Sequence, residues 1–241
     1  MDDIGDALAN VRERIARAAE EAQRDPASIR LVAVSKTKPA EDVRRAYLAG
    51  QRDFGENYVQ ELIEKAAQLT DLRDLRWHLV GHLQRNKVKS ALDVVSCVHS
   101  VDSTRLAREL GKRAAALQSD PNLSERARLS LLVEVNVGGE AQKSGIPPAE
   151  LGPLLATIEQ EPALQLAGLM TVPPHTPDPA DARPFFEELV RLRDHHGGAE
   201  RLPELSMGMT HDLEFAISAG ATIVRVGTAI FGSRNRSVAP E

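Results

Sequence analysis

The chain has 241 residues, of which 42% are hydrophobic and 27% are charged, and its formal net charge is −5. This composition is ordinary for a globular protein and provides enough chain to bury a full core. The mild negative charge gives no indication of the broad basic surface with which proteins bind nucleic acid or anionic membranes. Cys97 is the only cysteine, so an internal disulfide is excluded and a reducing compartment is favoured.

The N-terminal segment is amphipathic. Apolar residues recur at helical spacing from Ile4 to Ala18, and the pattern predicts a helix over residues 3–24. Its early acidic residues and the lack of an apolar core region distinguish it from a signal peptide. No stretch approaches the roughly 18 apolar residues that a membrane span needs. We therefore expect a cytoplasmic protein without a membrane segment.

Eight short apolar runs alternate with helical patterns along the chain. Strands separated by helices form parallel βαβ units, and eight such units in a chain of this length favour a closed barrel. An open doubly wound sheet is the main rival, but no glycine-rich fingerprint follows the first run. The sequence thus predicts a single-domain (β/α)8 TIM-type barrel over residues 1–241, with an extra N-terminal helix. The predicted strands are residues 30–35, 51–56, 76–81, 94–101, 129–137, 164–172, 203–208 and 221–227.

Two stretches between the periodic segments are rich in loop-forming residues. QSDPNLSERA, residues 118–127, predicts a polar loop with room for a small insertion. PPHTPDPAD, residues 173–181, predicts a solvated, proline-rich loop. Neither stretch marks a domain boundary, because the composition does not change across it.

The first predicted strand, LVAVS, runs directly into Lys36. Alternation puts Val32, Val34 and Lys36 on one face of that strand. The C-terminal ends of the strands form the working face of such a barrel, and the amine would project there. The alternative, which stays open from this stretch alone, is a lysine that reaches into solvent along its aliphatic stem. Lys38 lies beyond the strand and is expected to be solvated.

The last two predicted strands end in segments typical of phosphate loops. The segment LSMGM, residues 205–209, contains Ser206, and VRVGTAIFG, residues 224–232, contains Gly227 and a helical turn that opens at Thr228. Exposed backbone N–H groups at such turns suit an anion, and barrels often bind phosphate with the loops after their last two strands. Glycines that merely make tight turns are the alternative. Two such loops at the expected positions favour a phosphate site.

Arg225 lies in the middle of the last predicted strand, on the face that it shares with Ile223 and Gly227. An arginine that points into a barrel must be paired, because an unpaired buried charge is very costly. Its partner is either an interior carboxylate, for which Glu134 is a candidate, or a ligand. A lysine, a phosphate site and an inward arginine at one barrel mouth suggest pyridoxal phosphate, whose aldehyde reacts with lysine while its phosphate anchors the other end.

The chain resembles the pyridoxal phosphate homeostasis protein family, a single-domain relative of the alanine racemase barrel. Eight stretches across residues 32–232 carry the resemblance in the family's order, and their combination is far more specific than any one of them. Two positions depart from the family pattern: His211 stands where an acidic residue is common, and Asn136-Val137 stands where an Asn-Thr-type pair is usual. The matching stretches are AVSKTKP, FGENYVQE, WHLVGHLQRNK, HSVD, GLMTV, LSMGM, DLEFAISAG and VRVGTAIFG.

The resemblance implies that Lys36 carries pyridoxal 5'-phosphate as a Schiff base. It implies a place for Asn57 near the cofactor ring and a contact between Arg225 and the pyridine nitrogen. It further implies a carrier and regulator of the cofactor in amino-acid and vitamin B6 metabolism, not an enzyme, that passes the cofactor to apo-enzymes and exists as a monomer or weak dimer. The phosphate contacts that it implies are Ser206, Gly227 and Thr228.

The alternative function is a pyridoxal-phosphate-dependent amino-acid racemase. Racemisation needs acids or bases on both faces of the substrate carbanion. Racemases of this fold take the second group from an additional β-domain and a dimer partner. Because the sequence ends shortly after its last predicted strand, we expect that domain to be absent and the carrier function to be favoured.

Four further side chains invite a chemical interpretation. His78 and His82 have the spacing of a metal pair on a helix, but His82 is expected in a loop after a strand and no third ligand is evident. We therefore expect no metal site. Trp77 is expected to pack in the core or at the barrel mouth, and Cys97 is expected to be an inert core residue.

Overall fold

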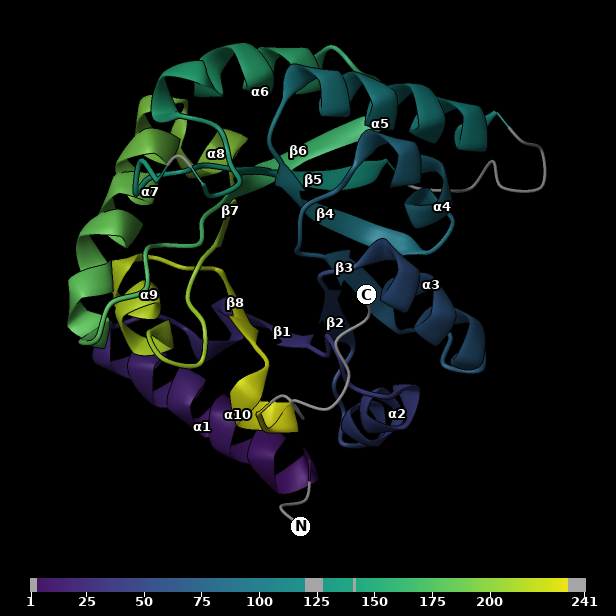
Figure 1. Ribbon diagram of the computed structural model, residues 1–241. Helices are drawn as coiled ribbons and strands as arrows, with labels where there is room; N and C mark the ends of the chain where they lie inside the picture. Colours follow the sequence, from purple (N-terminus) through teal and green to yellow (C-terminus); the bar gives the residue numbers. More distant parts are fainter. Residues whose placement is uncertain (1–3, 120–127, 141, 234–241) are drawn as a thin grey trace.

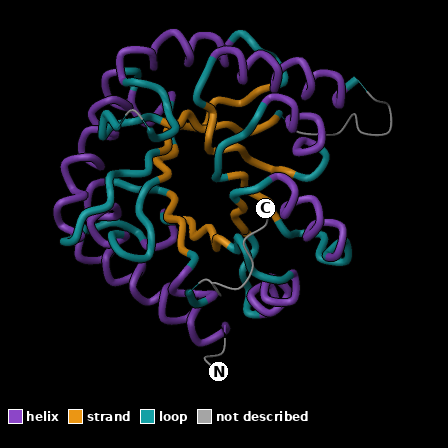
Figure 2. Tube along the Cα trace, viewed as in Figure 1, coloured by secondary structure: helices purple, strands orange, loops and turns teal. Residues whose placement is uncertain are grey.

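The computed structural model describes residues 4–119, 128–140 and 142–233, so most of the polar loop expected at 118–127 lies outside the described residues. Eight parallel strands close into a barrel in sequence order, and the helices surround it (Figures 1 and 2). The (β/α)8 barrel predicted from the sequence is therefore confirmed. The strands are β1 Arg30–Val34, β2 Asp53–Glu56, β3 Arg76–Leu79, β4 Val95–Val101, β5 Leu129–Glu134, β6 Leu164–Met170, β7 Glu204–Ser206 and β8 Ile223–Val226.

The helices cover the outer face of the barrel. The extra N-terminal helix is present as α1, which lies beside α9 and α10 (Figure 1). A side-chain ion pair between Arg14 and Glu214, at 2.8 Å, joins α1 to α9. The α-helices are α1 Ile4–Glu21, α2 Ala40–Leu48, α3 Val59–Gln68, α4 Val88–Leu92, α5 Thr104–Gln118, α6 Leu151–Glu159, α7 Arg183–His195, α8 Gly198–Arg201, α9 Leu213–Ala219 and α10 Thr228–Phe231.

The strands separate two apolar clusters. Leu31 and Ala33 belong to the large cluster that includes the buried faces of the helices, whereas Val32 belongs to a small separate one. Because neighbouring residues of a strand face opposite sides, the small cluster occupies the barrel interior. Cys97 belongs to it, and burial raises the pKa of its thiol to about 12, so the expectation of a core cysteine is confirmed. The members are Val32, Cys97, Leu132, Ala167, Met170 and Ile223.

All eight predicted strands are longer than the observed ones. The first strand does not reach Lys36 but ends at Val34, and β8 ends at Val226. Apolar or small residues that follow the last inter-strand hydrogen bond look like part of the strand in the sequence, although the strand has already ended. Trp77 is buried and packs against Phe54 with 6.1 Å between ring centroids, as expected of a core residue. Within the described residues, no helix is both long and apolar enough to cross a bilayer.

Candidate functional site

A cavity of about 350 Å³ lies at the C-terminal ends of the strands, where the working face of such a barrel is expected. Of the six residues that the sequence singled out, only Ser206 does not line it. The lining residues are Val34, Lys36, Thr37, Lys38, Asn57, Val80, Val172, Met209, Thr210, His211, Arg225, Gly227, Thr228, Phe231 and Gly232.

Lys36 lies in a tight turn that follows β1 rather than at the end of the strand itself. The N–H of Lys38 donates to the carbonyl of Ser35 at 3.0 Å, and Thr37 has a φ of 62°. A β-branched residue rarely adopts this left-handed conformation, which costs on the order of 1 kcal/mol or more and requires support from its surroundings. The carboxylate of Glu61 supplies part of that support, because its Oε2 accepts the N–H of Thr37 at 2.8 Å.

A buried ion pair holds the other side of this turn. The ammonium of Lys65, on α3, lies 2.7 Å from Glu56 Oε1 and donates to the carbonyl of Ser35 at 2.8 Å. The hydroxyl of Ser35 donates to the same Glu56 oxygen at 2.7 Å. Burial raises the pKa of Glu56 while the charge of Lys65 opposes the rise. The turn that carries Lys36 is thus tied to two elements, β2 and α3.

Asn57 follows β2 and is placed by a close backbone contact. A Cβ on Gly81, in the loop after β3, would lie only 2.3 Å from the carbonyl oxygen of Asn57. The hydroxyl of Ser100 donates to the Gly81 carbonyl at 2.6 Å and fixes the loop from its other side. Only glycine permits this approach, so the loop after β3 sets the position of Asn57 at the cavity.

Arg225 points into the barrel and lines the cavity, as alternation indicated. Among the described residues, Arg225 does not form the ion pair with Glu134 that the sequence left open as an alternative. Instead, Nη1 donates to the hydroxyl of Ser206 at 2.6 Å and Nη2 donates to the carbonyl of Thr171 at 2.8 Å. Burial lowers the pKa of Arg225 to about 10, with the charges of Glu134 and Asp212 opposing it, so the guanidinium remains charged at neutral pH.

Ser206 lies below the cavity, fully buried at the end of β7. Its hydroxyl contacts Arg225 and also His99 Nδ1, at 2.9 Å. The loop after β7 reaches the cavity only farther along, at Met209, Thr210 and His211. Ser206 therefore does not line the cavity, whereas Thr210, which the sequence did not single out, does.

Thr210 and Thr228 approach each other at one end of the cavity. The hydroxyl of Thr210 accepts the N–H of Ala229, in the first turn of α10, at 3.4 Å. Gly208 allows the intervening loop to fold back, because its φ is 90° and a Cβ there would lie 2.5 Å from the Cβ of Ala216. The two hydroxyls and the backbone at the start of α10 form a group of neutral donors suited to an anion.

His211, one of the two departures from the family pattern, lines this cavity too. Its ring centroid lies 6.1 Å from that of His175, in the proline-rich loop after β6. His211 therefore places an imidazole rather than a carboxylate in the described wall of the cavity.

Glu134 is a buried carboxyl at the C-terminal end of β5. Burial raises its pKa to about 7, the charge of Arg225 opposes that rise, and the charge of Asp102 adds to it. It does not line the cavity, but it lies on the inward face of β5, as Leu132 does.

We expect Glu134→Gln to stabilise the protein at high pH. The folded-state pKa of Glu134 is raised, so the folded state retains a proton that the unfolded state releases above its ordinary pKa of 4.5, and stability falls as pH rises from 4.5 to 7. The full cost above that range is about 3 kcal/mol. Denaturant unfolding at about pH 8 and about pH 5 measures it. The variant should gain stability only at the higher pH, the exposed control Glu187→Gln should gain none, and equal effects at both pH values would contradict this origin.

His78 and His82 do not form the metal-binding pair that their spacing suggested. His82 lies 3.2 Å from Asp102 at the barrel rim, whereas His78 points into the interior toward Asp53 and His99. The ligand atoms of His78, Cys97 and His99 lie within 4.8 Å of one another. Hydrogen bonds already occupy both ring nitrogens of both histidines, so this cluster is better described as a hydrogen-bonded chain than as a metal site.

The chemistry of the cavity fits an anionic aldehyde such as pyridoxal phosphate. Lys36 supplies a primary amine, Arg225 a guanidinium, and Thr210 and Thr228 hydroxyl donors. Among the described lining residues none carries a carboxylate, so no negative charge in the wall opposes a phosphate. The volume is also within the range of small-molecule sites.

Comparisons with known proteins agree with this geometry. The alanine racemase N-terminal domain model matches residues 7–235. The pyridoxal phosphate homeostasis protein of Pseudomonas aeruginosa is 46% identical over 237 residues, which are 98% of this chain and 97% of the relative. The structure of PipY of Synechococcus elongatus with pyridoxal phosphate bound is similar, with 38% identity, a TM-score of 0.79, and coverage of 95% of this chain and 100% of PipY.

A solved alanine racemase, from Corynebacterium glutamicum, shares the fold alone. It is 15% identical with a TM-score of 0.66, and the match covers 98% of this chain but 63% of the racemase. Close similarity over nearly the full chain is instead found among the homeostasis proteins. The chain therefore belongs to the pyridoxal phosphate homeostasis protein family, within the larger family defined by the alanine racemase N-terminal domain.

Proposed function

We propose that this protein binds pyridoxal 5'-phosphate covalently through Lys36 and acts in the intracellular homeostasis of that cofactor, as its carrier and regulator. The observation that carries the proposal is the convergence of Lys36, Arg225 and two threonine hydroxyls in one cavity whose described lining residues include no carboxylate. A relative that is 38% identical over nearly the whole chain has this cofactor bound.

The side chains divide the cavity into two ends. β1 and β8 are neighbours in the barrel, with Val32 beside Arg225, so Lys36 and the start of α10 follow adjacent strands. We assign the phosphate to Thr210, Gly227 and Thr228, where neutral donors gather. We assign the ring to the region of Asn57 and Arg225. When bound, the cofactor supplies an aldehyde that condenses with a primary amine and acidifies bonds next to that amine.

The protein's own residues favour retention and release over turnover. Arg225 only donates hydrogen bonds, and its positive charge disfavours protonation of any ring nitrogen beside it. Ser206 acts on the cofactor only through Arg225 in this arrangement. Apo-enzymes that require the cofactor are the proposed recipients.

A transfer experiment tests this function against the racemase alternative. The protein is loaded with pyridoxal phosphate, freed of unbound cofactor by gel filtration, and mixed with an apo-enzyme whose activity reports the cofactor. We expect activity to return, and we expect no interconversion of L- and D-alanine by chiral chromatography. Steady racemisation at an enzymatic rate, or failure to bind the cofactor at all, would overturn the proposal.

We expect the double variant Thr210→Val/Thr228→Val to weaken binding of pyridoxal phosphate but not of pyridoxal. Each hydrogen bond lost from a charged phosphate costs about 1.5–3 kcal/mol, so the Kd should rise by about tenfold or more per residue. Ser206→Ala serves as the comparison, because it lies below the cavity and should affect both ligands alike. Equilibrium titration with each ligand measures this, and equal losses for the two ligands in the double variant would place the phosphate elsewhere.

A further inference from the structure

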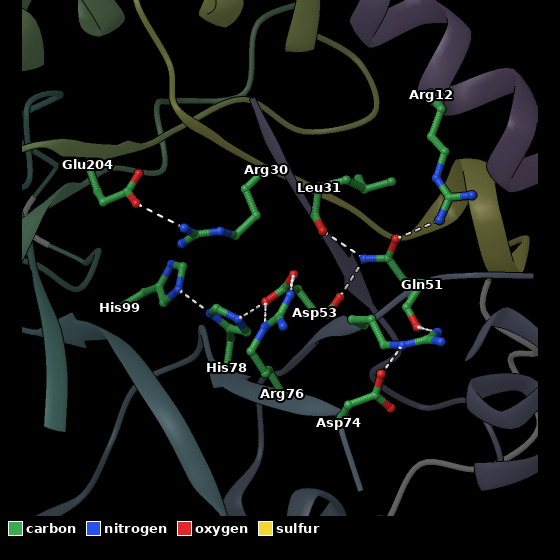
Figure 3. A network of polar contacts seen from close by, with 11 residues as sticks. Arg12, Arg30, Leu31, Gln51, Asp53, Asp74, Arg76, His78, His99 and Glu204 are labelled. Carbon is green, nitrogen blue, oxygen red and sulfur yellow. Dashed lines mark hydrogen bonds and ion pairs between the residues drawn. The ribbon is translucent and has the colours of Figure 1, made fainter. Parts of the chain in front are cut away.

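A chain of buried polar side chains crosses the barrel interior beneath the cavity. From the cavity downward, Arg225 contacts Ser206, Ser206 Oγ lies 2.9 Å from His99 Nδ1, and His99 Nε2 lies 2.9 Å from His78 Nδ1. His78 Nε2 then lies 2.9 Å from Asp53 Oδ1. Figure 3 shows the lower part of this chain, with His99, His78 and Asp53 in line. We call the five residues the interior relay.

The interior relay joins five strands and ends at the opposite rim of the barrel. Its members come from β8, β7, β4, β3 and β2 in turn. At the far end, Arg76 donates to both carboxylate oxygens of Asp53, with Nε at 2.8 Å and Nη2 at 2.6 Å (Figure 3). Burial opposes ionisation of Asp53, but the bonds from Arg76 and His78 outweigh it and hold the pKa of that carboxyl well below its usual range. Asp53, at the far end of the interior relay, is therefore ionised and can only accept hydrogen bonds.

The two end residues of the interior relay determine which atom of each residue between them carries a proton. An arginine can only donate and an ionised carboxylate can only accept. Since Arg225 donates to the Ser206 oxygen, the hydroxyl proton of Ser206 is directed at His99 Nδ1, and His99 carries its own proton on Nε2. That proton is directed at Nδ1 of His78, whose Nε2–H donates to Asp53. Every donor then has an acceptor, and both histidines are Nε2–H tautomers.

The reverse order leaves groups unsatisfied. If His99 donated from Nδ1, Ser206 would accept from two sides and its buried hydroxyl proton would lose the acceptor it has in the forward order. His99 Nε2 would then need a proton from His78 Nδ1, and a neutral His78 would turn a bare nitrogen toward the Asp53 carboxylate. A buried donor without a partner costs about 1–3 kcal/mol. Burial and the neighbouring positive charges also lower the pKa of His99 well below its usual range, so it carries only one ring proton.

We propose that His99 is a positioning residue for Arg225, which it holds toward the cavity through Ser206 and an ordered interior relay anchored on Asp53. Two of the five N–H groups of Arg225 are engaged by Ser206 and Thr171, which fixes the plane of the guanidinium. The remaining N–H groups of Arg225 are thereby directed toward the cavity that Arg225 lines. The relevance of this aim to the cofactor rests on the proposed function, but the proton order is a property of the protein without ligand.

The first test is the ring-nitrogen spectrum of the apoprotein. Two-bond ¹H–¹⁵N correlation at about pH 8 distinguishes the two neutral tautomers, since a protonated and a bare ring nitrogen differ widely in shift. We expect both His78 and His99 to carry the proton on Nε2, with assignments from His78→Gln and His99→Gln. A proton on Nδ1 of His99 in the wild-type protein would overturn the proposal without any variant having to fold.

The second test separates positioning from mere support of the fold. Hydrogen exchange of the Arg225 guanidinium, assigned by its absence in Arg225→Lys, should be slow in the wild type and at least about tenfold faster in His99→Phe, which removes both polar ring atoms. His99→Gln supplies one acceptor and one donor and should restore slow exchange. Ser206→Ala breaks the same chain with a smaller change and replaces His99→Phe if that variant does not fold. The exposed His195→Gln is the matched control.

Cofactor titration completes the experiment. The Kd for pyridoxal phosphate should rise about tenfold in His99→Phe and stay within about threefold of wild type in His99→Gln. Unchanged arginine exchange in a folded His99→Phe or Ser206→Ala protein would overturn the positioning role. If the wild-type protein failed to bind the cofactor while the tautomers and the exchange behaved as expected, the proposed function would fail and the interior relay would stand.

Discussion

Lys36→Ala should abolish covalent capture of pyridoxal phosphate. Among the described residues that line the cavity, only Lys36 and Lys38 carry a primary amine. Lys36 directly follows the residue after β1, whereas the ammonium of Lys38 donates to the carbonyl of Ser233 at 2.9 Å. Borohydride reduction followed by peptide mapping should therefore find pyridoxyl on Lys36 in the wild-type protein and none in the variant, a complete loss rather than a graded one.

Lys38→Ala is the matched control, two residues away and in the same turn. It should retain the label on Lys36, with at most a modest loss of affinity from the removed positive charge. Noncovalent binding of the phosphate end should persist in Lys36→Ala, because Thr210, Gly227 and Thr228 are untouched. Label appearing chiefly on Lys38, or an unchanged absorption band in Lys36→Ala, would refute the assignment of the amine.

How much of this site the sequence could predict depends on the range of the interaction. Strand alternation is local, and it placed Arg225 on the inward face of β8 and Lys36 at the C-terminal end of the first strand, while the succession of strands and helices predicted the barrel. It could not show that β1 ends before Lys36, because the left-handed turn at Thr37 is held by Glu61, a residue on another element. A β-branched residue gives no local sign of such a turn.

The interior relay is beyond the reach of alternation for a different reason. A histidine inside the apolar strand VVSCVHSV was a visible signal, and alternation would have put His99 on the same face as Cys97. Which side chain it meets across the barrel depends on the register of strands that are not its sequence neighbours. Ser206 is the clearest case: its strand position is right, but its contacts are Arg225 and His99 rather than the cavity.

Lys65→Met should be the most destabilising of the substitutions discussed here. Lys65 is 6% exposed, and its ammonium is the partner of Glu56, which is fully buried. Methionine keeps the length and apolar stem of the side chain but leaves the Glu56 carboxylate buried without its counter-charge. Breaking a buried ion pair from one side typically costs about 3–5 kcal/mol, and denaturant unfolding should show a loss of that size.

The pH dependence and the double variant identify the cause. The pKa of Glu56 is already raised in the folded state by burial, and removing the charge of Lys65 raises it further. A raised folded-state pKa means that the folded protein holds a proton which the unfolded chain has released, so the loss should grow as pH rises above the ordinary carboxyl pKa. Glu56→Gln/Lys65→Met should recover much of the stability, because no buried charge remains, while the exposed control Lys112→Met should change little. A loss that is independent of pH and unrelieved in the double variant would show that Lys65 acts through packing alone, and that the turn carrying Lys36 does not depend on this charge pair.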